Sequence, residues 1–319
     1  MAQLVLGMGV SHGPQLGIPA ERWHLLREKD QNDKRFSYTD LLASRHLPGI
    51  ENEITPEKMK KRYDDCMKAL ARLKETLDRV SPDVLVVVGD DQHEHLLDDN
   101  MPVFCIYRGA SAEAVKRQGR RQVPWRRADE EGRETGLKSY SCAPELAEHL
   151  IKNLIHKGFD VACSNQLRPE VGLGHAFTTM YRQIMPEGRI PIVPFMVNTF
   201  YPPNQPTPQR CYELGLALRE AIAAWDGNNR VGIIASGGLS HVIIDEEIDR
   251  ATIEGLQNKD KEKLFSLPVE KLVFGTSEIR NWIVAGGAFE PMDMKLIDYV
   301  PCYRSEAGTG CAMGFAEWQ

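Results

Sequence analysis

The stretch Val84-Leu-Val-Val-Val-Gly-Asp-Asp-Gln-His-Glu-His95 decides the fold class. Its first five residues are all valine or leucine, and such an uninterrupted run is typical of a central strand that is buried on both faces of a sheet. Residues 89–95 then form a polar cluster where the strand ends. Because open α/β sheets bind ligands at the carboxyl ends of their strands, the stretch predicts both a layered fold and the place of its site.

Predicted strands and helices alternate on both sides of this stretch. Residues 56–80 carry apolar side chains every three or four positions, which predicts an amphipathic helix with Thr55 as its N-cap. The alternation favours an α/β fold, in which one layered domain spans residues 1–319 and helices flank a central mixed sheet. Further strands are predicted at 4–10, 102–107, 159–163, 190–199, 230–236, 295–303 and 310–316, and further helices at 144–157, 209–225, 246–264 and 276–285.

The composition excludes several classes of protein. Hydrophobic residues make up 42% and charged residues 26%, as in an average globular protein, and the net charge of −6 argues against nucleic-acid binding. No apolar run approaches the roughly 18 residues of a membrane span. The seven cysteines are odd in number and lack a CxxC pair, which predicts reduced, mostly buried thiols and a cytoplasmic location.

Five of the nine histidines follow predicted strands or lie in glycine-rich turns, namely His12, His93, His95, His175 and His241. Several histidines that converge from different strands indicate a metal or acid–base site. Two histidines and one carboxylate form the ligand set of non-haem Fe(II) oxygenases. Glu278 is the best carboxylate candidate, although its position at the start of the predicted helix 276–285 is also typical of a residue that complements the helix dipole.

The chain resembles the class III extradiol ring-cleaving dioxygenases, the family of the protocatechuate 4,5-dioxygenase catalytic subunit. Four stretches carry the resemblance in the family's order: Ser11-His-Gly-Pro14, Val86-Val-Val-Gly-Asp-Asp-Gln-His93, Ala235-Ser-Gly-Gly-Leu-Ser-His241 and Gly275-Thr-Ser-Glu-Ile279. The resemblance implies that His12, Glu278 and a second histidine hold Fe(II). It also implies that His241 is the acid–base residue, that His175 is a further active-site histidine, and that Ser305 contacts the substrate or its neighbours.

The turn after the predicted strand 84–88 leaves the second histidine ligand open. The family has an Asn-Asp-His type turn there, whereas this chain reads Asp90-Asp91-Gln92 with His93 next. A strict match places Gln92, a poor iron ligand, at the ligand position. We expect His93 to be the ligand because it is the nearest histidine, with His95 and Gln92 as alternatives.

The basic segment 114–138 bears on the substrate. Runs of charge are usually solvated loops, but arginine binds carboxylates in a bidentate manner and stacks on aromatic rings. We therefore expect residues 13–56 and 114–138 to cover the site, and Arg126, Arg127 and Trp125 to meet a carboxylated catechol of the protocatechuate, gallate or methylgallate type.

The expected function is that of an Fe(II)-dependent extradiol dioxygenase, which opens the ring of an aromatic diol with O₂ in the breakdown of lignin-derived aromatics. Relatives are often oligomers, so we expect a homo-oligomer. Two alternatives stay open, a metal-dependent hydrolase and a non-catalytic member of the same fold family. Iron content and oxygen uptake with a catechol distinguish the three.

Overall fold

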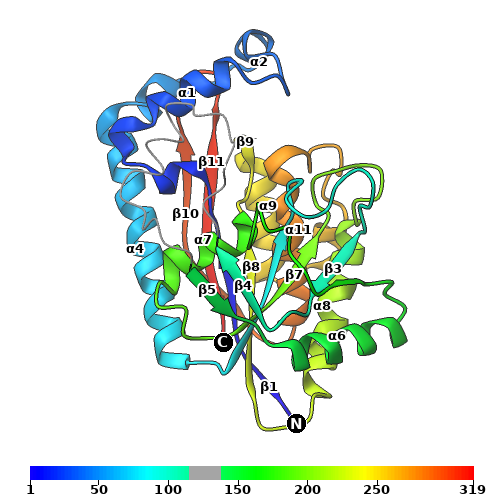
Figure 1. The fold of residues 1–319 in the computed structure, drawn as a ribbon. Coiled ribbons are helices and arrows are strands. Elements are labelled where there is room, and N and C mark those ends of the chain that lie inside the picture. Colours follow the sequence, from blue (N-terminus) through cyan, green and yellow to red (C-terminus); the bar gives the residue numbers. More distant parts are fainter. Residues whose placement is uncertain (115–137) are drawn as a thin grey trace.

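The computed structural model describes residues 1–114 and 138–319, and a mixed β-sheet forms its centre (Figure 1). The strands of the sheet are β1 (Gln3–Val10), β2 (Val84–Asp90), β3 (Phe104–Tyr107), β6 (Ala162–Ser164), β7 (Ile192–Val197), β8 (Arg230–Ser236), β9 (His241–Ile243), β10 (Met294–Tyr303) and β11 (Thr309–Trp318). Their order is β10-β11-β1-β8-β2-β7-β3-β6, and β9 pairs with β11. A second, two-stranded sheet joins β4 (Ser111–Ala114) to β5 (Lys138–Ser141).

The four central strands β1, β8, β2 and β7 run parallel to one another. The sheet becomes mixed at its sides, where β11 is antiparallel to β1 and β3 is antiparallel to β7. The predicted α/β class with a mixed central sheet is thus confirmed. Because β1, β8 and β2 are neighbours, the residues that follow their carboxyl ends meet at one edge of the sheet.

Helices cover both faces of the sheet (Figure 1). They are α1 (His24–Gln31), α2 (Tyr38–Ser44), α3 (Ile50–Glu53), α4 (Pro56–Val80), α6 (Pro144–His156), α7 (His175–Ile184), α8 (Pro208–Ala223), α9 (Glu246–Gln257), α10 (Lys261–Phe265) and α11 (Ile279–Ala288). Short 3₁₀ turns lie at Pro14–Gly17, Ala20–Arg22 and Phe274–Glu278. One apolar core includes buried residues of α4 and α7, and the other includes those of α6, α8 and α11.

Strand β2 is buried along its whole length, as its valine and leucine run predicts. Val86 and Val88 belong to the core shared with α8 and α11, whereas Leu85 and Val87 belong to the core shared with α4 and α7. Each fully buried side chain of this kind contributes roughly 1.5–3 kcal/mol. The strand is therefore held from both sides, and its end at Asp90 is a rigid place for a site.

Helix α4 follows its sequence pattern closely. The Thr55 side chain accepts a hydrogen bond from the backbone N–H of Lys58 at 3.2 Å, so the predicted N-cap is confirmed. Leu70, Leu73 and Leu77 lie on the buried face of the helix. Amphipathic spacing and a capping side chain are both local properties, which is why the sequence predicts this helix well.

Two predicted helices differ in the structure. Residues 246–264 form α9 and α10 rather than one helix, and α11 begins at Ile279 rather than at 276. Neither Thr276 nor Ser277 caps α11. The Thr276 hydroxyl bonds the backbone of His241, and the Ser277 hydroxyl donates to Thr199 at 3.1 Å. Because both hydroxyls bond residues far away in the sequence, neither caps the helix.

A buried ion pair ties residues 13–56 to the end of β10. Arg304 donates from Nε and Nη2 to the two carboxylate oxygens of Asp30 in α1, at 2.7 and 2.9 Å. Both side chains are buried, and Thr309 donates a further hydrogen bond to Asp30 at 2.6 Å. The contact fixes α1 against β10 and β11. The prediction that residues 1–319 form one domain, in which residues 13–56 and 114–138 cover the site, stays a prediction.

We expect Arg304→Met to lower the free energy of unfolding by about 3–5 kcal/mol, because it leaves the Asp30 carboxylate buried without its partner. Chemical denaturation followed by circular dichroism measures this loss. Lys60→Met, which removes an exposed pair with Asp64, serves as the control and should leave the midpoint nearly unchanged. An Arg304→Met midpoint equal to that of the parent would contradict a stabilising role of the Arg304–Asp30 ion pair.

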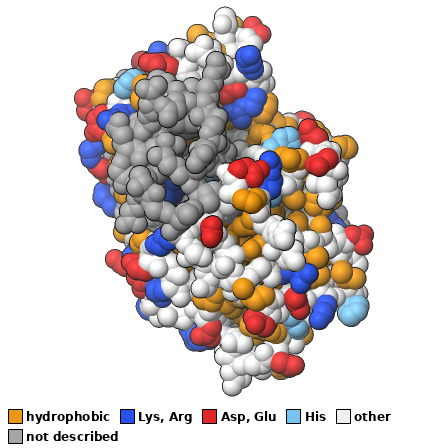
Figure 2. Space-filling view, viewed as in Figure 1, with side chains coloured by type: hydrophobic (Ala, Val, Ile, Leu, Met, Phe, Trp, Pro, Cys, Tyr) orange, Lys and Arg blue, Asp and Glu red, His pale blue; other side chains and the backbone are white. Residues whose placement is uncertain are grey.

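The surface and the thiols agree with the composition. Six of the seven cysteines are buried and only Cys163 is exposed, as expected for thiols used as small apolar side chains. Acidic and basic side chains are interspersed over the described part of the face in Figure 2. Among the described helices, none has both the length and the apolarity needed to cross a bilayer.

Candidate metal centre

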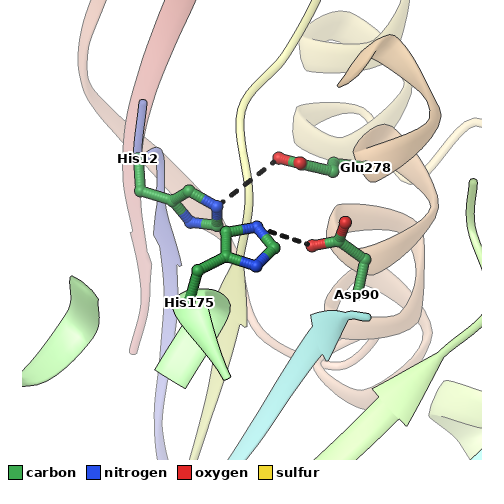
Figure 3. Close-up of side chains that lie close together, drawn as sticks. All are labelled: His12, Asp90, His175 and Glu278. Carbon is green, nitrogen blue, oxygen red and sulfur yellow. Dashed lines mark ion pairs between the residues drawn. The ribbon is translucent and has the colours of Figure 1, made fainter. Parts of the chain in front are cut away.

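Four side chains converge at the carboxyl edge of the parallel strands (Figure 3). His12, Asp90, His175 and Glu278 each offer one ligand atom, and these atoms all lie within 4.8 Å of one another. His12 follows β1, Asp90 ends β2, His175 begins α7, and Glu278 ends the 3₁₀ turn before α11. Three of the four are buried and His175 is partly exposed, so the group is enclosed but not sealed.

The imidazole of His12 presents Nε2 to the group. Its Nδ1 lies 3.2 Å from the hydroxyl of Ser236, and that hydroxyl donates its own hydrogen to the carbonyl of Ala176 at 2.6 Å. Nδ1 must therefore carry the hydrogen, which leaves a lone pair on Nε2. Nε2 is buried without a hydrogen-bond partner among the described residues. Burial lowers the pKa of His12 to about 3, so the ring is neutral and able to coordinate.

His175 presents the same nitrogen. Its Nδ1 lies 2.9 Å from a carboxylate oxygen of Glu94, and its Nε2 lies 3.7 Å from Oδ1 of Asp90. The rings of His175 and His12 meet edge to face, with centroids 5.2 Å apart. Two imidazoles thus aim Nε2 at two carboxylates across a small space.

Asp90 and Glu278 are both buried, and their pKa values shift in opposite directions. Burial and the charge of Glu278 raise the pKa of Asp90. Burial alone would also raise the pKa of Glu278, but the neighbouring His241 lowers it through its charge and its contact with the carboxylate. Gln92 donates to both carboxylates from Nε2, at 3.0 Å to Asp90 and 3.3 Å to Glu278. Two neighbouring anions in a buried site favour a bound cation.

The donor set fits a divalent transition metal. Imidazole nitrogens and carboxylate oxygens suit Fe(II), Mn(II) and Zn(II), and neutral imidazole is the form that coordinates. Nε2 of His12 and Oδ1 of Asp90 are buried atoms that lack hydrogen-bond partners in the described part of the chain. A cation between them would satisfy both atoms and would offset the repulsion of the two carboxylates.

His241 lies beside this group rather than in it. Its Nε2 is 3.4 Å from Oε1 of Glu278, and its Nδ1 is 2.8 Å from the carbonyl of Leu239. Burial lowers the pKa of His241, but the charge and contact of Glu278, together with Cys311 and the carbonyl of Leu239, raise it overall to about 10. The ring packs on Gly275, where an added Cβ would lie 1.9 Å from Cδ2 of His241. Only glycine leaves room for the imidazole.

The structure places the expected second ligand, His93, outside the group. His93 stacks on Tyr201 with 3.7 Å between ring centroids, and its Nε2 lies 3.1 Å from Asp98. His95 accepts a hydrogen bond from the backbone of Arg168 instead. Of the three candidates in this turn, Gln92 is the one whose side chain contacts Asp90 and Glu278. His93 has a φ of 54°, in the left-handed region, and its ring lies on Tyr201 in the loop after β7.

Of the four predicted substrate residues, the structure describes only Ser305, and its side chain bonds elsewhere. Ser305 is fully buried, and its hydroxyl bonds that of Thr309 at 2.7 Å, in the network around the ion pair of Arg304. Trp125, Arg126 and Arg127 lie outside the described residues. Their contact with a substrate stays a prediction.

Asp90, Glu94 and Ser236 have site contacts that sequence reasoning did not assign. Asp90 and Glu94 stand two residues before and two residues after Gln92. The Gln92 side chain contacts Asp90 in the metal group, and the Glu94 side chain contacts His175. The polar cluster after the predicted strand 84–88 contains these carboxylates, but only its histidines and Gln92 were considered as ligands. Ser236 ends β8 next to His12, a contact between residues 224 positions apart in sequence.

Comparison with known proteins gives consistent matches. The family described as the catalytic LigB subunit of aromatic ring-opening dioxygenase matches residues 40–305. A gallate dioxygenase of Pseudomonas putida is 33% identical over 122 residues, 37% of this chain and 34% of the relative. A 2,3-dihydroxyphenylpropionate/2,3-dihydroxicinnamic acid 1,2-dioxygenase of Burkholderia vietnamiensis is 30% identical over 168 residues, 53% of this chain and 46% of the relative.

The corresponding dioxygenase of Azotobacter vinelandii is 27% identical over 172 residues, 54% of this chain and 48% of the relative. The matched region thus spans about half the length or less of these curated relatives. The family match is broader, because it covers most of the chain and includes Asp90, His175, His241 and Glu278. The chain belongs to the family of catalytic LigB subunits of aromatic ring-opening dioxygenases.

Proposed function

We propose that this protein is an extradiol dioxygenase that opens the ring of an aromatic diol with O₂ at a mononuclear Fe(II) site. The observation that carries the proposal is the convergence of His12, Asp90, His175 and Glu278 within 4.8 Å, in a chain that belongs to this family. His12, His175 and Glu278 would hold the metal, with Asp90 as a fourth donor. His175 takes the ligand place for which His93 was expected.

A bound Fe(II) supplies a Lewis acid that lowers the pKa of the diol and a redox centre that reacts with O₂. The protein groups around it have separate tasks. His241 holds Nε2 at the edge of the site and is not needed as a ligand. With a cation held by Glu278, the carboxylate charge that raises the pKa of His241 would be offset, and the neutral ring would take the proton of a diol hydroxyl and return it later. Its ring is kept in place by Leu239 and Gly275.

A carboxylated substrate agrees with the names of the relatives. Those names specify gallate, 2,3-dihydroxyphenylpropionate and 2,3-dihydroxicinnamic acid, all carboxylates of aromatic diols or triols. The basic segment 114–138 offers arginines for such a group. We propose a substrate of the protocatechuate, gallate or methylgallate type. The oligomeric state is a separate matter, and the expected homo-oligomer stays a prediction.

Oxygen uptake tests this function. Protein reconstituted with Fe(II) under anaerobic conditions is mixed with catechol, protocatechuate, gallate or methylgallate in an oxygen electrode, with a chelator-treated sample as control. We expect one O₂ consumed for each ring-opened product, and faster turnover of the carboxylated diols than of catechol. Absence of uptake with every diol would overturn the dioxygenase and favour the hydrolase or non-catalytic alternatives. Faster turnover of catechol would overturn only the substrate class.

A further inference from the structure

Glu94 is a buried carboxylate at the edge of the site that is not itself part of the metal group. One of its oxygens, Oε2, accepts two hydrogen bonds from His175, from the backbone N–H at 2.8 Å and from Nδ1 at 2.9 Å. His175 is also the first residue of α7, so the carboxylate lies at the N-terminus of a ten-residue helix. The helix dipole and the free N–H groups there stabilise a negative charge.

The turn that follows β2 holds Glu94 in this place. The side chain of Asp91 accepts hydrogen bonds from the backbone N–H groups of Glu94 at 2.8 Å, His95 at 2.9 Å and Leu96 at 3.2 Å. On the other side, Gly174 leaves the space that the carboxylate needs, because an added Cβ would lie 2.7 Å from Oε2. Two independent features of the chain therefore accommodate the contact between Glu94 and His175.

The three imidazoles of the site differ in the group that lies within hydrogen-bond distance of Nδ1. For His12 this group is the hydroxyl of Ser236, and for His241 it is the carbonyl of Leu239. Among the described contacts of these three rings, His175 is the one whose Nδ1 meets a carboxylate. A carboxylate is the strongest acceptor of the three, and a carboxylate behind a metal-bound imidazole raises the donor strength of its other nitrogen.

We propose that Glu94 is the positioning residue of His175. It fixes the tautomer in which Nδ1 carries the hydrogen, aims Nε2 at Asp90 and strengthens that nitrogen as a metal ligand. The ligand part of this inference rests on the proposed metal site, whereas the tautomer part does not. The two parts are therefore measured separately.

The tautomer is read on metal-free protein labelled with ¹⁵N-histidine, by long-range ¹H–¹⁵N NMR, with His175→Gln used to assign the signal. We expect the parent protein to show His175 with the hydrogen on Nδ1. Glu94→Ala should give a mixture of tautomers, and Glu94→Gln should keep the parent tautomer because its amide oxygen still accepts. An unchanged tautomer in Glu94→Ala would overturn the inference.

Metal affinity is measured by anaerobic titration with Fe(II) and, as a stable probe, with Co(II). Glu94→Ala should weaken binding by about 10–100-fold, the usual effect of losing such a partner, and Glu94→Gln by less. Glu317→Gln is the matched control, since Glu317 is buried and bonds Thr76 away from any histidine. Equal affinity in the parent and both Glu94 variants would overturn the ligand part.

These outcomes separate the inference from the proposed function. If the NMR result holds and no diol is cleaved, the role of Glu94 stands and the dioxygenase proposal fails. If diols are cleaved and the tautomer does not depend on Glu94, the dioxygenase stands and the inference fails. Circular dichroism confirms that each variant is folded, and the isosteric Glu94→Gln keeps the affinity test valid if Glu94→Ala does not fold.

Discussion

His12→Ala is expected to weaken Fe(II) binding by more than about 100-fold and to abolish ring cleavage. His12 supplies an unprotonated, buried Nε2 to the group that it forms with Asp90, His175 and Glu278. Loss of a group that merely supports a ligand typically costs 10–100-fold in metal affinity, so loss of the ligand itself should cost more. Iron content after gel filtration and anaerobic titration measure the effect.

The control for this variant is His24→Ala. His24 is an exposed histidine whose Nδ1 bonds the carbonyl of Glu21 in its own turn, so its removal should leave iron content and turnover unchanged. Thermal unfolding shows whether His12→Ala keeps the fold, since Ser236 loses its contact with the ring. Full iron retention in folded His12→Ala would remove His12 from the ligand set.

His241→Ala is expected to keep its iron and to lose turnover by about 10²–10⁴-fold, the usual contribution of a general acid or base. The ring of His241 lies 3.4 Å from Glu278 but does not belong to the four-residue group. Removing it should therefore leave the donors in place and take away the proton acceptor. Iron content and oxygen uptake, measured on the same sample, separate the two effects.

His241→Asn accompanies this variant because alanine leaves a hole beside Gly275. The asparagine fills part of the hole without a titratable nitrogen, and it should lose turnover to a similar extent. If His241→Ala lost its iron while His12→Ala kept it, the roles of the two histidines would have to be exchanged.

Much of the scaffold could be predicted from local patterns. The valine and leucine run of residues 84–88 is hydrophobic enough to require burial on both sides, and the helix 56–80 carries its own cap at Thr55. Local sequence also indicated where the site would lie, because polar residues follow several strands whose carboxyl ends meet. His12, His175, His241 and Glu278 all stand at this edge of the sheet.

The partners of each side chain could not be read from sequence. In the turn after β2, the Asp91 side chain binds three backbone N–H groups, and Gln92 faces the carboxylates while His93 stacks elsewhere. A shift of one residue thus separates an expected ligand from a residue that contacts the site. Nearest-histidine reasoning has no access to the direction in which a turn points a side chain.

Strands, caps and the edge that holds the site follow from periodicity and residue type, because these act over a few neighbouring residues. The metal group itself is a tertiary property. Glu94 meets His175 across 81 positions and Gln92 meets Glu278 across 186. Only the packing of α7 and α11 against β1 and β2 brings these atoms within reach, since hydrogen bonds and metal coordination depend on distances of a few ångströms that no local pattern encodes.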